Sequence, residues 1–102
     1  MQEILYVEIP TTDATAVCTW LQQEWKPEIG QKIMTPDGIR LQGLQKTSTA
    51  QPAIPESELS IFIWTLQRTT YLKVFRWGQT LIPGENRIRQ QLLSDIRKQF
   101  PP

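Results

Sequence analysis

The apolar and polar residues of this chain follow two periods, and the shorter one predicts β-strands. Segments 3–9, 31–35, 39–44, 59–66 and 71–77 have strand length and are rich in β-branched, aromatic and aliphatic residues. Segment 3–9 is apolar almost throughout, which is typical of a central strand buried on both faces. Pro10 ends that strand because proline cannot donate to a ladder.

Apolar residues at helical spacing predict two helices. The first follows Thr11, Thr12 and Asp13, which all offer N-cap side chains, and ends near Trp25 because Pro27 disfavours helical backbone before it. Its stripe consists of Ala14, Val17, Cys18, Leu21 and Trp25. The second covers 85–99 after Pro83 and Gly84, and its stripe consists of Ile88, Leu92, Leu93, Ile96 and Phe100.

Turn residues join the predicted strands into two hairpins. Pro36, Asp37 and Gly38 separate 31–35 from 39–44, and this order of residues favours a tight turn. The inward residues of that hairpin are predicted to be Ile33, Ile39 and Leu41. Residues 67–70 are the predicted turn of the second hairpin. Segment 45–58 is polar and aperiodic with two prolines, so we expect a long loop there, of the length at which loops become functional or mobile.

The order of elements is therefore β-α-β-β-loop-β-β-α. It predicts a single small α+β domain over residues 1–102, with a largely antiparallel sheet of about five strands. Two helices lie on one face of that sheet. This arrangement is distantly ferredoxin-like, although the order of elements does not match that fold cleanly.

The chemistry available to the chain argues against an enzyme. Histidine is absent, which removes the commonest general base and the commonest metal ligand. The single cysteine, Cys18, lies on the inner side of the first helix and is expected to be a core residue. No phosphate-binding, dinucleotide-binding or nucleophile-elbow motif occurs. We therefore expect no catalytic residues, no cofactor and no metal.

Hydropathy and charge bear on location and partners. No apolar run approaches the ~18–20 residues that cross a bilayer, and no signal-like segment opens the chain. These features predict a cytoplasmic protein without membrane insertion. The chain carries eight acidic and four basic residues through Glu58, and two acidic and seven basic from Leu59 onward. This asymmetry suggests attraction between the halves or an anionic partner for the second half.

Aromatic residues of the second hairpin form the candidate site. Strand alternation places Tyr71, Lys73, Phe75 and Trp77 on one face, with Phe62 and Trp64 of the preceding strand beside them if the aliphatic residues lie under the helices. The residues expected to bind a partner are Trp64, Arg68, Tyr71, Lys73, Phe75 and Trp77.

Three interpretations of this aromatic face stay open. In the first interpretation, the long loop covers the aromatic face through Ile54. Alternatively it contacts another protein or a second copy of the chain, since large apolar patches usually mark contacts. Otherwise it stacks the bases of single-stranded nucleic acid between basic residues, although a net charge of +1 is low for such a binder. We expect a non-catalytic protein-binding module, an accessory, assembly or regulatory subunit of a larger complex, with nucleic-acid binding as the alternative.

Overall fold

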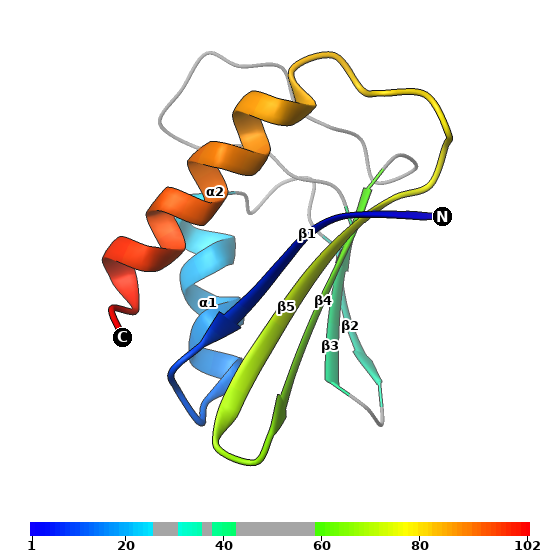
Figure 1. The fold of residues 1–102 in the computed structure, drawn as a ribbon. Coiled ribbons are helices and arrows are strands. Elements are labelled where there is room, and N and C mark those ends of the chain that lie inside the picture. The colour runs from blue at the N-terminus through cyan, green and yellow to red at the C-terminus, as the bar shows by residue number, and fades with distance from the viewer. Residues whose placement is uncertain (26–30, 36–37, 43–58) are drawn as a thin grey trace.

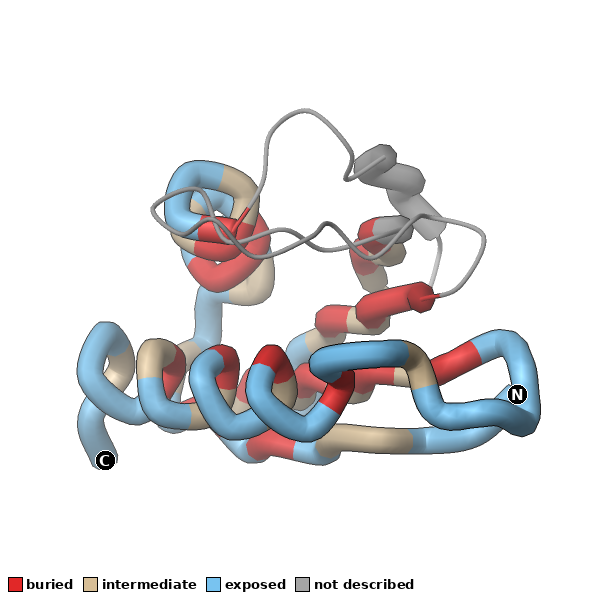
Figure 2. Tube along the Cα trace, turned by 90° about the horizontal axis from the view of Figure 1, so that it is seen from above, coloured by how far each residue is buried: buried red, intermediate tan, exposed pale blue. Residues whose placement is uncertain are grey.

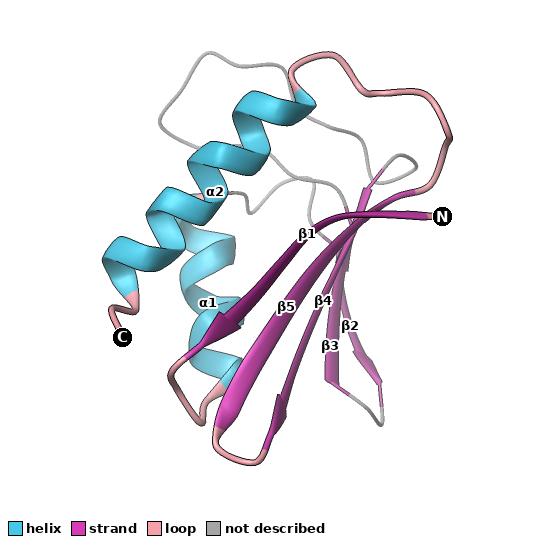
Figure 3. Ribbon diagram, in the orientation of Figure 1, coloured by secondary structure: helices cyan, strands magenta, loops and turns pink. Residues whose placement is uncertain are grey.

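The computed structural model describes residues 1–25, 31–35, 38–42 and 59–102. The chain forms β1 (Gln2–Ile9), α1 (Ala14–Glu24), β2 (Gln31–Thr35), β3 (Gly38–Gln42), β4 (Leu59–Leu66), β5 (Thr69–Arg76) and α2 (Glu85–Gln99). The predicted α+β class and the antiparallel sheet are confirmed (Figures 1 and 3). The distant ferredoxin-like likeness stays a prediction.

The sheet has five strands in the order β1-β5-β4-β3-β2, and every neighbouring pair is antiparallel. β1 therefore lies at an edge, and the prediction that it is a central strand was wrong. Its apolarity has another cause. A register shift between Glu3 and Leu5 breaks the alternation, and both Ile4 and Leu5 pack against the core. Bulges and edge charges such as Glu3 and Glu8 also discourage pairing with another chain.

Both helices lie on the same side of the sheet, as predicted (Figure 1). α1 packs against β3 and β4, and α2 packs against β1. The opposite side of the sheet, which we call the open face, carries neither helix. Strand alternation divides the residues accordingly: Leu72 and Val74 of β5 are buried under the helices, whereas their neighbours Tyr71, Lys73 and Phe75 are partly exposed on the open face.

The core between helices and sheet is aliphatic. Figure 2 shows the buried positions of α2 on one side of that helix. Its fully buried members include Ile9, Val17, Cys18, Leu21, Trp25, Ile61, Ile63, Leu72, Leu92 and Ile96. Cys18 is buried, as the sequence predicts for a core cysteine. Neither helix of the described residues is long and apolar enough to cross a membrane.

The helix ends form where the sequence predicts them. The Asp13 side chain accepts a hydrogen bond from the Ala16 amide at 3.0 Å, which caps α1. At the other end of α1, the indole of Trp25 donates to a carboxylate oxygen of Asp95 on α2 at 3.1 Å. Trp20 meets Phe100 edge to face, with 5.6 Å between ring centroids. These contacts fix the two helices against each other.

The second hairpin is tighter than predicted. The turn holds two residues, Gln67 and Arg68, because Thr69 and Thr70 already belong to β5. Both turn residues have positive φ, at 52° and 70°, which matches the hairpin turn whose twist suits the flanking strands. Arg68, a predicted binding residue, is therefore part of a strained turn.

Arg76 and Glu85 join the end of β5 to the start of α2. The Arg76 guanidinium donates to both carboxylate oxygens of Glu85 at 2.8 Å, and both residues are buried. The same guanidinium donates to the Gly78 carbonyl at 3.0 Å. This pair joins two separate elements, so it can be found only in the three-dimensional structure.

Some sequence predictions fall outside the described part of the chain. They are the loop over 45–58 with its proposed cover residue Ile54, the turn at Pro36 and Asp37, and the strand end at 43–44. The side chain of Ile33 is not described either, whereas Ile39 and Leu41 of the same hairpin are buried as predicted.

Candidate functional site

The register of the strands arranges the open-face side chains in rows across the sheet. The middle row runs Arg40, Phe62, Lys73 and Tyr6 from β3 to β1. The row toward the β4–β5 turn holds Trp64, Tyr71 and Glu8, and the row on the other side holds Ser60, Phe75 and Glu3. Each row thus carries aromatic side chains at its centre and a charged residue at the β1 edge or next to it.

Three aromatic rings stack across three strands of this face. Tyr71 of β5 lies between Tyr6 of β1, at 6.2 Å between centroids and 23° between planes, and Trp64 of β4, at 5.4 Å and 18°. Phe62 and Phe75 meet edge to face at 5.4 Å. Such pairs add roughly 0.5–1.5 kcal/mol each beyond the area they bury. The rings therefore form a rigid platform.

Lys73 lies among these rings and is charge-paired. Its ammonium lies 5.4 Å from the centroid of Tyr6 and 5.9 Å from that of Trp64, within the range of a cation–π contact. It also lies 3.2 Å from a carboxylate oxygen of Glu3. Glu3 therefore offsets much of the positive charge that Lys73 brings to the face. This pair also links the acidic first half of the chain to the basic second half.

The platform is hollowed and partly exposed. A hollow of about 600 Å³ is lined by Met1, Gly38, Phe62, Trp64, Leu66, Lys73 and Phe75, among others. A second one of about 370 Å³ lies over Tyr6, Tyr71 and the same Trp64, Leu66 and Lys73. Leu66 is 56% exposed, Tyr6 45% and Trp77 42%. Large apolar side chains thus remain accessible around the rings.

Arg40 stands at the β3 side of the face. Its Cα pairs with that of Phe62 in the register. Within the described part of the chain, its Nε is covered from solvent yet meets no hydrogen-bond acceptor. A covered guanidinium N–H without an acceptor is unfavourable. Arg40 therefore brings a positive charge to the β3 side of the face, and its Nε gains no bond within the described part of the chain.

Of the six predicted binding residues, four lie together on the open face: Trp64, Tyr71, Lys73 and Phe75. Trp77 follows β5, and its indole donates to the hydroxyl of Ser60 at 2.8 Å, so it flanks the face beside Phe75. Arg68 lies in the hairpin turn and lines neither hollow.

Sequence reasoning missed four residues of this face. They are Glu3, Tyr6, Glu8 and Arg40. Glu3, Tyr6 and Glu8 were missed because β1 was predicted to be a central strand buried on both faces. The pattern of β1 does alternate from Tyr6 onward, and that alternation was the available signal.

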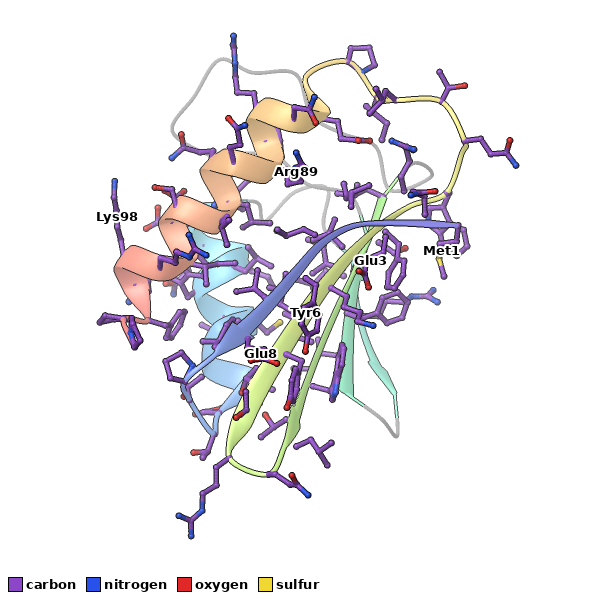
Figure 4. All side chains as sticks on the ribbon, in the orientation of Figure 1. Met1, Glu3, Tyr6, Glu8, Arg89 and Lys98 are labelled. Carbon is purple, nitrogen blue, oxygen red and sulfur yellow. The ribbon has the colours of Figure 1, made fainter. Side chains whose placement is uncertain are left out.

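The described residues hold no group of three or more candidate metal ligands. The basic residues of α2, Arg87, Arg89, Arg97 and Lys98, lie on the other side of the molecule from the open face, and Figure 4 shows Lys98 directed away from the sheet.

The phenol of Tyr6 offers a spectroscopic test of this packing. Desolvation raises the pKa of Tyr6 above its usual value, and the hydrogen bond it donates to Glu8 at 2.9 Å adds to the shift. Tyr6 and Tyr71 are the two tyrosines of the chain. In a Tyr71→Phe variant, we expect ultraviolet absorbance to titrate Tyr6 with a midpoint above that of the denatured chain. Adding Glu8→Gln should move the midpoint down.

The sign for stability follows from the raised pKa. The contribution of Tyr6 is complete below the unfolded value of about 10 and is lost as pH rises through the folded pKa. A Tyr6 midpoint equal to or below that of the denatured chain would contradict the packing described here.

Comparison with known proteins finds no family model, no curated protein and no solved structure that matches this chain.

Proposed function

We propose that this chain is a non-catalytic protein-binding module, an accessory, assembly or regulatory subunit, and that the open face of its sheet is the docking surface. The observation that carries this proposal is the stack of Tyr6, Tyr71 and Trp64 on the face that neither helix covers. Trp and Tyr are the residues that most often anchor protein interfaces.

The surroundings of the stack support a protein ligand. Accessible apolar side chains, including Leu66 and Trp77, flank the rings, and contiguous apolar patches on folded proteins mark contact sites. Charged residues stand toward the margins, with Glu3 and Glu8 on β1 and Arg40 on β3. An aromatic centre with a polar rim is the usual anatomy of an interface.

The charges on the face argue for protein over single-stranded nucleic acid. A stacking platform for bases needs unpaired cations along the phosphates. Here Lys73 is paired with Glu3, and Glu8 adds a second carboxylate beside Tyr6. Two carboxylates at the same edge would repel a phosphate backbone. The nucleic-acid alternative is therefore kept only as an outcome of the experiment.

The test uses two leucines with similar exposure. Leu66 on the open face is 56% exposed, and Leu81 in the connection between β5 and α2 is 60% exposed. Tagged wild type, Leu66→Ser and Leu81→Ser are used at low salt to capture proteins from native extract after nuclease treatment. We expect Leu66→Ser to lose the stoichiometric protein that wild type and Leu81→Ser retain. Affinity should fall at least about tenfold, because truncating an interface anchor costs ~1–3 kcal/mol.

Two results would contradict the proposal. One is equal capture by both serine variants, which would place the contact elsewhere. The other is capture of nucleic acid without protein from extract that was not treated with nuclease. If this nucleic acid is released when the salt concentration is raised, the single-stranded nucleic-acid alternative is established. Because both leucines are exposed, circular dichroism should give the two variants the melting temperature of wild type.

A further inference from the structure

Charges on the open face are divided between its two margins. Glu3 and Glu8 stand on β1, and Arg40 stands on β3, with the strands β5 and β4 between them. Figure 4 shows Glu3, Tyr6 and Glu8 following one another along β1. A partner that complements this face must bring a cation to the β1 margin and an anion to the β3 margin. A second copy that is turned over presents its Arg40 to the β1 margin and its Glu3 and Glu8 to the β3 margin.

A two-fold axis parallel to the strands, midway between β4 and β5, turns the face over in this way. It places β5 of one copy on β4 of the other and β1 of one copy on β3 of the other. Each row of side chains then meets the same row of the second copy. A two-fold axis across the strands gives the opposite result, because it sets the two β1 strands and their carboxylates against each other.

The strand register predicts which side chains meet under the parallel axis. Tyr71 of one protomer lies over Trp64 of its partner, so the aromatic centres of the two faces meet. Lys73 lies over Phe62, and Phe75 lies over the small Ser60. Each aromatic or long side chain therefore meets a different side chain of the second copy, and the same contacts occur twice, as in an isologous interface.

At the margins, the same axis brings Arg40 toward the acidic margin of the second copy. Arg40 of one protomer lies over Tyr6 of its partner, one row from Glu8, whose carboxylate already accepts from the Tyr6 hydroxyl. The guanidinium has five N–H donors on a long side chain, and the donors other than the covered Nε are the ones that a second copy can meet. Glu3 and Glu8 of the second copy are each one row away, and Glu3 already pairs with Lys73, so Glu8 is the anion that we assign to Arg40.

We propose that a second copy of this chain binds face to face on the open face about this two-fold axis, with Arg40 of each protomer bound by Glu8 of the other. The proposal rests on the proposed function, in that it names the protein that this face binds. Three strands of eight residues and β3 with five, spaced about 4.8 Å apart, give a footprint of roughly 450 Å² per copy. That is at the low end for specific interfaces, so the expected dissociation constant is in the micromolar range.

The test is charge reversal in two proteins that are then mixed. Sedimentation equilibrium across the micromolar range is expected to show a dimer for wild type. Arg40→Glu and Glu8→Arg should each weaken that dimer at least about tenfold, because each sets like charges opposite one another. An equimolar mixture of the two variants should recover association as a heterodimer. Arg87→Glu on α2 changes the net charge equally and should leave the dimer intact.

Arg40→Gln accompanies Arg40→Glu in case the reversed charge unfolds the monomer, and it should also weaken the dimer. A monomeric wild type, unaffected charge variants or a mixture that stays dissociated would overturn the second-copy proposal. These failures differ from failure of the proposed function. If wild type is monomeric, and Leu66→Ser loses the captured protein while Leu81→Ser retains it, the face binds a protein other than a second copy. If Leu66→Ser and Leu81→Ser capture equally, the proposed docking face itself is wrong.

Discussion

Replacing Glu85 by alanine is expected to lower the free energy of unfolding by about 3–5 kcal/mol, because it leaves the Arg76 guanidinium buried without its anion. Both N–H···O contacts of this pair are 2.8 Å, and the side chains of Arg76 and Glu85 are 9% and 5% exposed. Glu85 opens α2, so the loss also frees the start of that helix from the end of β5.

The comparison that isolates the buried charge is a double variant. Arg76→Met with Glu85→Leu removes both charges and fills similar volume, so it should be far more stable than Glu85→Ala alone. Glu3→Ala is the control, since the Glu3–Lys73 pair is 45% and 35% exposed and such pairs contribute about 0–1 kcal/mol. Urea denaturation measures all three. A Glu85→Ala loss no larger than that of Glu3→Ala would contradict the buried pair.

Replacing Gly38 by alanine is expected to destabilise the fold by about 2–4 kcal/mol. Gly38 has φ +153°, and a Cβ built there would lie 2.3 Å from the carbonyl oxygen of Ile63 and 2.9 Å from Cβ of Trp64. The backbone of β4 cannot move away without breaking its pairing with β5, so β3 must shift instead. Because Trp64 is the β4 member of the ring stack, that shift should also disturb the open face.

Gly78→Ala is the matched control for this substitution. No atom lies within 4 Å of a Cβ added at Gly78, so its effect should stay within about 0.5 kcal/mol. The denaturation midpoint measures stability, and near-ultraviolet circular dichroism reports on the packing of Trp64 against Tyr71. Equal midpoints for the two alanine variants would show that β3 does not approach β4 as described.

Local signals explain what the sequence predicted well. α2 has the predicted bounds because its glycine start, its first-turn glutamate and its apolar stripe are all encoded within one segment. Alternation likewise placed Tyr71, Lys73 and Phe75 on one face of β5. Each of these features depends only on neighbours in sequence.

Pairing between distant segments explains what the sequence missed. Alternation assigns a side chain to a face but does not tell which strand lies beside it. Tyr6 therefore could not be joined to Tyr71 before β1 was known to pair with β5. The bond of Trp25 to Asp95 and the pairing of Arg76 with Glu85 have the same origin, since each links separate elements. Glu3 and Glu8 likewise join the candidate site only because β1 pairs with β5.

Hydroxyl-radical footprinting measures directly whether the open face binds protein. The chain alone and the chain in its captured complex are oxidised in parallel and compared residue by residue. We predict that Tyr6, Leu66 and Trp77, all exposed in the single chain, become protected in the complex, whereas Leu81 stays reactive. Protection of Leu81 with unchanged oxidation of Tyr6 and Leu66 would contradict the claim.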